Sequence, residues 1–136
     1  MTFVVDASVT LAWCFQDELS ERADQVLDRL TSEDAVAPSI WPLEVAAGLR
    51  SAERRNRLAA GELPGLRQLL SALPIRVDPI SLDGALSEVL EMARALELTA
   101  YDAAYLSLAV RRGLPLATID DRLRDAAGRA GIEVLG

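Results

Sequence analysis

The chain has 136 residues, of which 51% are hydrophobic and 26% charged, a balance that predicts a single folded domain over residues 1–136. Its net charge of −7 argues against a protein that binds duplex nucleic acid nonspecifically. All 14 basic residues are arginine and histidine is absent, which excludes histidine catalysis, His-ligated zinc and lysine chemistry. Any chemistry therefore has to use carboxylates, hydroxyls, arginine or a bound metal.

The sequence shows no membrane-spanning or targeting segment. Its longest apolar stretches, near residues 9–15 and 103–110, are far shorter than the roughly 20 residues that cross a bilayer. The N-terminus lacks the basic region of a signal peptide. A single cysteine, Cys14, excludes an internal disulfide and fits a reducing compartment. We therefore expect a cytoplasmic protein with no membrane partner.

Short apolar segments alternate with helical ones in the first half of the chain. In order, we predict a buried strand at 2–5, a helical segment through about 9–31, a strand at 35–38, a helix over 41–58 and a helix around 65–72. Pro38 ends the second strand, and Pro42 lies in a first helical turn, where proline is tolerated. Gly61 and the Pro64–Gly65 pair are expected to break the chain before the last of these helices.

The second half continues the alternation. In order, we predict a strand at 75–77, helices over 82–98 and 100–112, a strand at 116–118, a helix over 121–130 and a last strand at 133–135. Apolar residues from Leu82 to Leu96 recur at i, i+4 and i+7, which is typical of an amphipathic helix. The 100–112 segment is apolar nearly all round, which indicates a central buried helix that Gly113 ends. The alternation predicts an α/β fold with a short parallel sheet flanked by helices.

Acidic residues stand at strand ends or helix starts in four separate segments. They are Asp6 after the first strand, Glu44 and Asp102 in the first turns of their helices, and Asp120 with Asp121 after the 116–118 strand. Ligands of parallel α/β sheets bind at the carboxyl ends of the strands, so these acids are expected to face one crevice. Each also has a simpler interpretation. Asp6 or Ser8 can cap a helix, Asp120 suits an N-cap, and Thr99 with Asp102 matches a capping box.

Four carboxylates in one crevice favour a metal site over four unrelated caps. Glu44 and Asp102 stand beside apolar residues, where a lone charge is costly to bury. Clustered carboxylates repel one another and raise each other's pKa unless a cation lies among them. Oxygen ligands suit Mg²⁺ or Mn²⁺, which lowers the pKa of a bound water and stabilises charge on a phosphoryl oxygen. Hydrolysis of a phosphodiester bond needs little beyond such a site.

The segments around the acids, VVDASV, WPLEVAAGL, TAYDAAYLSLA and LPLATIDDRL, resemble the four acidic motifs of PIN-domain nucleases. The match runs in order along the whole chain and is strongest to single-domain VapC-type toxins of type II toxin–antitoxin modules. The resemblance implies a three-layer PIN-like fold with a carboxylate cluster at the strand carboxyl ends. It also implies a Mg²⁺- or Mn²⁺-dependent endoribonuclease with an RNA substrate, often tRNA or rRNA. A cognate VapB-type antitoxin and a homodimer are the implied partners.

The same resemblance assigns roles to individual residues. The implied metal ligands, direct or through water, are Asp6, Glu44, Asp102 and Asp120, and the implied orienting hydroxyls are Ser8 and Thr118. Many relatives carry Asn one helical turn after the Glu, where this chain has Ala47, so a contact that supports the metal is expected to be missing. Asp120 matches the Thr-x-Asp spacing of the family, and Asp121 is interpreted as a first-turn residue.

Four arginines and three aromatic residues each allow two different roles. Arg50, Arg54, Arg55 and Arg57 either guide an RNA backbone towards the metal or form a solvated helix face with ordinary ion pairs. Trp13, Phe15 and Trp41 are interpreted as core, although an exposed subset would suit a groove for an antitoxin helix.

Other carboxylate-dependent functions compete with the nuclease interpretation. Haloacid-dehalogenase-like phosphatases and response-regulator receiver domains begin similarly, but both use a lysine near the phosphoryl group and this chain has none. The remaining alternative is a catalytically silent PIN-fold module that only binds a partner. Metal-dependent cleavage that is lost in Asp6→Asn would distinguish the nuclease from that module.

Overall fold

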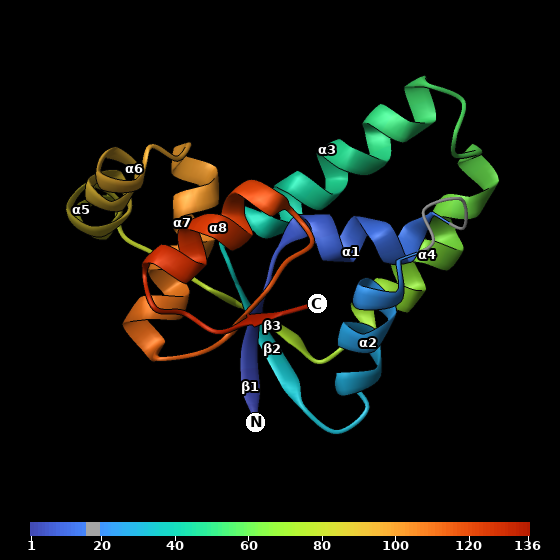
Figure 1. Cartoon of the computed structure of the whole chain (residues 1–136). Helices are drawn as coiled ribbons and strands as arrows, with labels where there is room; N and C mark the ends of the chain where they lie inside the picture. Colours follow the sequence, from blue (N-terminus) through green and yellow to red (C-terminus); the bar gives the residue numbers. More distant parts are fainter. Residues whose placement is uncertain (16–19) are drawn as a thin grey trace.

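The computed structural model describes residues 1–15 and 20–136, which contain a five-stranded parallel sheet (Figure 1). The strands are β1 (Thr2–Val5), β2 (Asp34–Pro38), β3 (Ile75–Asp78), β4 (Leu116–Ala117) and β5 (Val134–Leu135). Their order across the sheet is β3-β2-β1-β4-β5, and every neighbouring pair is parallel. The predicted α/β fold with a parallel sheet is confirmed, and all five carboxyl ends lie along one edge.

Helices cover both faces of the sheet and make three layers. One face packs against α1 (Ala7–Cys14) and α2 (Glu21–Arg29), and the other against α7 (Ala100–Arg112) and α8 (Asp121–Arg129). Alternation along β1 explains both layers, since Phe3 and Val5 join the core with α1 and α2 while Val4 joins the core with α7 and α8. The central strands β1, β2 and β4 are therefore buried on both sides, while the edge strand β3 is partly exposed.

The remaining elements extend from this central unit. They are α3 (Trp41–Arg54), the 3₁₀ turn η1 (Ala60–Glu62), α4 (Leu63–Ser71), α5 (Leu82–Gly84), the π-helical turn η2 (Ala85–Val89) and α6 (Leu90–Leu96). Figure 1 shows α3 running out past α1, with the chain returning through α4. In the part of the chain that the structure describes, no helix is both long and apolar enough to cross a membrane.

The helical segment predicted over about 9–31 contains two separate helices, α1 and α2. α1 ends at Cys14 because Phe15 is extended, with φ −120° and ψ 115°. α2 starts at Glu21, where the Ser20 hydroxyl accepts a hydrogen bond from the Ala23 N–H and caps the helix. Residues 16–19 of the predicted helix lie outside the described residues.

Other boundaries differ from the prediction in smaller ways. The helix predicted over 41–58 ends at Arg54, and Asn56 has a left-handed φ of 59°. Pro64 does not break the chain before α4 but lies in its first turn, where its missing N–H costs nothing. The segment predicted as helix over 82–98 is helical, but Leu82 and Leu86 are 76% and 53% exposed. Only part of the apolar face of this segment is therefore buried in the core of the chain.

α7 matches the prediction in both boundaries and burial. It spans Ala100–Arg112, and Gly113 ends it with a left-handed φ of 64°. Its residues from Ala103 to Ala109 are buried except for the half-buried Ala104. Because α7 packs on β1 and β2, its first turns reach the edge where these strands end.

Candidate active site

Asp6 lies at the carboxyl end of β1 and is only 3% exposed. The Ser8 hydroxyl donates a hydrogen bond to Asp6 Oδ1 at 2.7 Å, and the Val9 N–H donates to the same oxygen at 3.1 Å. The Thr118 hydroxyl donates to Asp6 Oδ2 at 2.6 Å. Three donors therefore hold this carboxylate, and both predicted hydroxyls are among them.

Burial dominates the electrostatics of Asp6. It raises the pKa of this carboxyl to about 6, the three hydrogen bonds lower it, and the charge of Asp120 raises it further. The Val9 bond also makes Asp6 the N-cap of α1, so the predicted capping role is present, and Ser8 does not take it. Capping alone does not require burial, which leaves the burial of Asp6 to be explained.

Thr118 links Asp6 to Asp120, the acid that follows β4. Its hydroxyl accepts the Asp120 N–H at 3.0 Å while it donates to Asp6. Asp120 caps α8, as its Oδ1 accepts the Leu123 N–H at 3.1 Å. Asp121 occupies the first turn of α8 and is exposed, which agrees with its interpretation as a first-turn residue.

Asp102 lies in the first turn of α7, where the Thr99 hydroxyl accepts its N–H at 3.1 Å. Partial burial raises the pKa of the Asp102 carboxyl, and the charge of Asp120 raises it too. Arg122 and Thr99 act in the opposite direction. Asp120 is therefore an electrostatic neighbour of both Asp6 and Asp102, which come from two other segments.

Glu44 is joined to the site by a residue to which the sequence assigned no role. The Tyr105 hydroxyl donates a hydrogen bond to Glu44 Oε1 at 2.5 Å. Burial raises the pKa of Tyr105, as do its bond to Glu44 and the charges of Glu44 and Asp6, while the Ala7 backbone acts in the other direction. The one signal in the sequence was a phenol within an apolar helix, since buried tyrosine hydroxyls usually have a partner.

The donor chemistry of these residues fits a hard cation, while their spacing brings them together in pairs. Among residues 1–15 and 20–136, no three acidic or cysteine side chains are close enough to hold one metal ion between them. Magnesium commonly binds through one or two carboxylates, keeps several waters and takes substrate oxygens as further ligands. Paired carboxylates with raised pKa values, Asp6 and Asp102 beside Asp120, suit that mode.

The basic residues after Glu44 do not behave as one cluster. Arg50 forms an ion pair with Glu53 at 2.9 Å, and the Arg57 guanidinium lies 4.9 Å from the centre of the Phe15 ring. Arg54 is the last residue of α3, and Arg55 follows it. The residues lining a cleft of about 300 Å³ include Arg55 and Arg57 together with Ser8, Gly48 and Ile119. Arg55 is therefore connected with the acidic site through a shared cleft.

The two tryptophans and Phe15 pack in or against the core, whereas Ala47 is exposed. Phe15 is buried, and the indole N–H groups of Trp13 and Trp41 donate to the Ala23 carbonyl and the Thr10 hydroxyl. Their interpretation as core residues is confirmed. Ala47 is exposed on α3 and offers no polar group one turn after Glu44.

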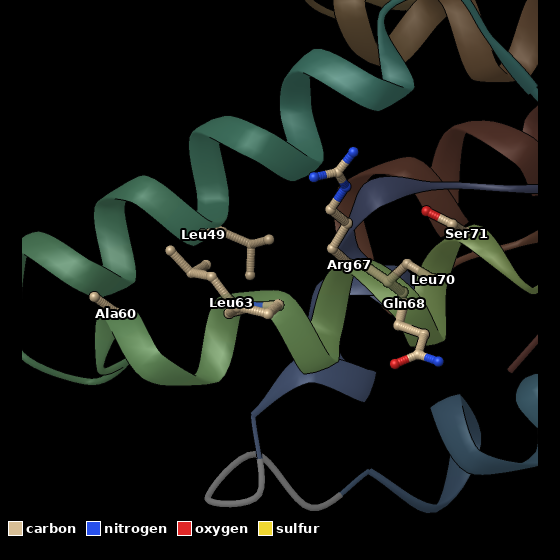
Figure 2. A pocket seen from close by; sticks show the side chains of 8 residues that line it. Leu49, Ala60, Leu63, Arg67, Gln68, Leu70 and Ser71 are labelled. Carbon is tan, nitrogen blue, oxygen red and sulfur yellow. The ribbon is translucent and has the colours of Figure 1, made fainter.

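A second concave surface lies between α3 and α4 (Figure 2). It is a groove of about 750 Å³ lined by Leu49, Ala60, Leu63, Pro64, Arg67, Gln68, Leu70 and Ser71. Figure 2 shows Leu49 and Leu63 facing one another across it. The groove is mainly apolar and contains none of the four acids predicted as ligands.

Comparisons with known proteins agree with this arrangement. The PIN domain family model matches residues 3–129. VapC ribonuclease Mb0985 from Mycobacterium bovis is 34% identical over 122 residues, covering 90% of this chain and 88% of the relative.

Two solved structures have a similar fold. PAE2754 from Pyrobaculum aerophilum superposes with a TM-score of 0.69 at 25% identity, over 93% of this chain and 84% of the other. A toxin–antitoxin complex from Klebsiella pneumoniae gives 0.66 at 20% identity, over 98% and 96%. The resemblance seen in the four acidic motifs is thereby confirmed at the level of the family. The chain belongs to the PIN-domain family, and its curated relatives are VapC ribonucleases.

Proposed function

We propose that residues 1–136 act as one nuclease domain, a metal-dependent endoribonuclease toxin that hydrolyses RNA phosphodiester bonds. The supporting observation is the pairing of acids from separate segments near the carboxyl edge of the sheet, where Asp120 interacts electrostatically both with Asp6 and with Asp102. The ribonuclease names of relatives that match 90% or more of this chain supply the substrate class.

The proposed cation is Mg²⁺ or Mn²⁺, held by Asp6, Glu44, Asp102 and Asp120 directly or through water. When bound, such a cation activates water and neutralises charge on the phosphoryl oxygens. The chain's own part is to keep the carboxylates oriented. Ser8 and Thr118 do this for Asp6 by donating one hydrogen bond to each of its two oxygens.

The RNA backbone is proposed to approach through the cleft that contains Ser8 and Arg55. An arginine in the cleft that also contains Ser8, the hydrogen-bond partner of Asp6, attracts a phosphate that the acidic surface otherwise repels. Arg50 is a weaker candidate because Glu53 already neutralises it. We therefore expect Arg55→Gln to weaken RNA binding more than Arg50→Gln does.

An antitoxin of the VapB type is the proposed regulator, and the groove between α3 and α4 is its proposed binding site. Its apolar lining of Leu49, Leu63 and Leu70 suits the apolar face of a helix. The solved Klebsiella pneumoniae neighbour, a toxin–antitoxin complex, supports a partner of this kind. The proposed setting of both proteins is the cytoplasm, where RNA is accessible.

A homodimer is also proposed. Leu43, Leu82 and Leu86 are large exposed apolar side chains, and a second copy would cover them. We expect a solution mass of about twice the 14.7 kDa of one chain, and a monomer for Leu86→Glu. Light scattering of the purified protein measures both.

The decisive experiment incubates purified protein with total tRNA and rRNA in the presence of Mg²⁺, Mn²⁺ or a chelator. Discrete fragments that need metal and disappear in Asp6→Asn support the nuclease. Asp121→Asn is the matched control, since it removes a nearby carboxylate that occupies only a first helical turn. Folded, antitoxin-free protein that cuts no RNA with either metal would instead favour the silent binding module.

A further inference from the structure

Tyr105 is a buried polar side chain that the proposed chemistry does not use. Its phenol is 2% exposed and lies in the core that α7 forms against β1 and β2. Its hydroxyl reaches across 61 residues of sequence to Glu44 Oε1 at 2.5 Å. A hydrogen bond to a carboxylate is strong, so this contact restricts where the Glu44 side chain can point.

The start of α3 is restrained at a second point. The Trp41 indole N–H donates to the Thr10 hydroxyl at 2.9 Å, and that hydroxyl donates to the Asp6 carbonyl at 3.1 Å. Trp41 lies one helical turn before Glu44, so it ties the backbone of α3 to the residue at the end of β1. Tyr105 then restrains the carboxylate itself.

The pattern of hydrogen bonds leaves one side of Glu44 available. Tyr105 occupies Oε1, and none of the described residues donates a hydrogen bond to Oε2. Ala47, one turn further along α3, supplies no polar group to the carboxylate. Tyr105 is therefore the one described side chain that orients Glu44 through a hydrogen bond.

We propose that Tyr105 is a positioning residue that holds Glu44 in place for a divalent cation shared with Asp6. This inference rests on the proposed function. Residues that hydrogen-bond to a metal ligand typically contribute a factor of 10 to 100 in metal affinity. Tyr105→Phe keeps the ring in the core and removes only the hydroxyl, so a loss of about tenfold in Mn²⁺ affinity is expected.

The chain offers a matched control. It has two tyrosines, both on α7, and Tyr101 is 59% exposed. The test measures the Mn²⁺ dissociation constant by calorimetry for the wild type, Tyr105→Phe, Tyr101→Phe, Glu44→Gln and the double variant Tyr105→Phe/Glu44→Gln. Tyr105→Phe should weaken binding about tenfold and Tyr101→Phe should not. The double variant should bind no more weakly than Glu44→Gln alone, because the hydroxyl acts through Glu44.

Three outcomes would overturn the inference. Wild-type affinity in folded Tyr105→Phe shows that the hydroxyl positions nothing, and a further tenfold loss in the double variant shows that it acts elsewhere. A wild-type protein that binds no Mn²⁺ overturns the proposed function together with this inference, and is distinguished from the other two by the wild-type measurement alone.

A second measurement does not depend on how well the Phe variant folds. Labelling the tyrosine ring carbon that bears the hydroxyl gives two NMR signals, one for each tyrosine. Mg²⁺ should shift the Tyr105 signal in the wild type, and Glu44→Gln should abolish that shift. An unchanged Tyr105 signal on Mg²⁺ binding, or a shift that survives Glu44→Gln, would contradict the proposal.

Discussion

The chain passes from strand to helix through an aspartate at two neighbouring places, after β1 and after β4. Asp6 and Asp120 each cap the following helix, accepting the N–H of the residue three positions on. Asp120 is exposed, whereas Asp6 is buried and accepts two hydroxyl hydrogen bonds in addition. The same local pattern therefore occurs in two environments, and capping does not explain why Asp6 is buried.

Burial is what makes the Asp6 environment costly. A carboxylate loses hydration when it is buried, which disfavours its charged form. Burial accordingly raises the pKa of Asp6 to about 6. The two hydroxyls offset part of the cost, and the proposed cation would offset the rest. Asp6 thus has a structural role as the cap of α1 and a proposed chemical role as a metal ligand.

The largest expected effect is on cleavage. Asp6→Asn removes one proposed ligand charge at the centre of the acids, and the rate with Mn²⁺ should fall roughly 1,000-fold, equivalent to several kcal/mol of lost charge stabilisation. Asp121→Asn should cleave at close to the wild-type rate. Initial rates on the identified RNA, together with circular dichroism of both variants, check this. Equal rates for Asp6→Asn and wild type would remove Asp6 from the site.

The next largest effect is the change of folding stability with pH that the buried Asp6 carboxyl causes. The folded pKa of Asp6 is about 6 against an ordinary value of 3.8, so between these pH values the folded state holds a proton that the unfolded state has lost. The Asp6 contribution to metal-free stability should therefore fall by about 3 kcal/mol in total as pH rises from about 3 to about 7, most steeply between the two pKa values, and then stay constant. Urea unfolding with chelator measures it. Asp6→Asn should flatten this decline, and an equal decline in that variant would contradict the assignment.

Thr118 tests the connection between the two strand ends. Thr118→Val removes the hydroxyl that donates to Asp6 and accepts the Asp120 N–H, and should cost about 2 kcal/mol of unfolding free energy at pH 7.5. Thr31→Val is the control, because that hydroxyl makes one exposed hydrogen bond. It should change stability by less than about 0.5 kcal/mol. Similar losses of unfolding free energy in the two variants would mean that the two hydrogen bonds of Thr118 stabilise the fold no more than one exposed hydrogen bond does.

The smallest effect concerns the exposed cap. Asp120→Ala should cost about 1 kcal/mol of unfolding free energy in chelator, as the loss of an N-cap usually does. Asp121→Ala, in the same first turn, should cost a few tenths through the helix dipole alone. Thermal unfolding of both variants compares them. A larger loss for Asp121→Ala would reverse the assignment of the cap.

The sequence predicted the sheet well because each strand is a short apolar run followed by a polar residue or a turn. Asp6 could be located for the same reason because it directly follows β1, and Asp120 follows β4 after Thr118 and Ile119. The break between α1 and α2 was missed, although Ser20 before Glu21 carried a capping signal. Hydrophobic periodicity continued across that break and outweighed the signal.

The contact between Tyr105 and Glu44 could not be found in the same way. The two residues are 61 positions apart, and they meet because α7 and the start of α3 converge on the end of β1. No local pattern encodes that distance. Likewise the spacing of apolar residues over 82–98 did not reveal that Leu82, in α5, is 76% exposed.

The most direct test of the central claim is anomalous diffraction from a crystal of the protein grown with Mn²⁺. The acids at the carboxyl edge of the sheet are proposed to hold the cation, so the strongest anomalous peak should lie among Asp6, Glu44, Asp102 and Asp120. A Mn²⁺ peak elsewhere, or no peak near Asp6 in a crystal grown at pH 7.5 with millimolar metal, would contradict the account.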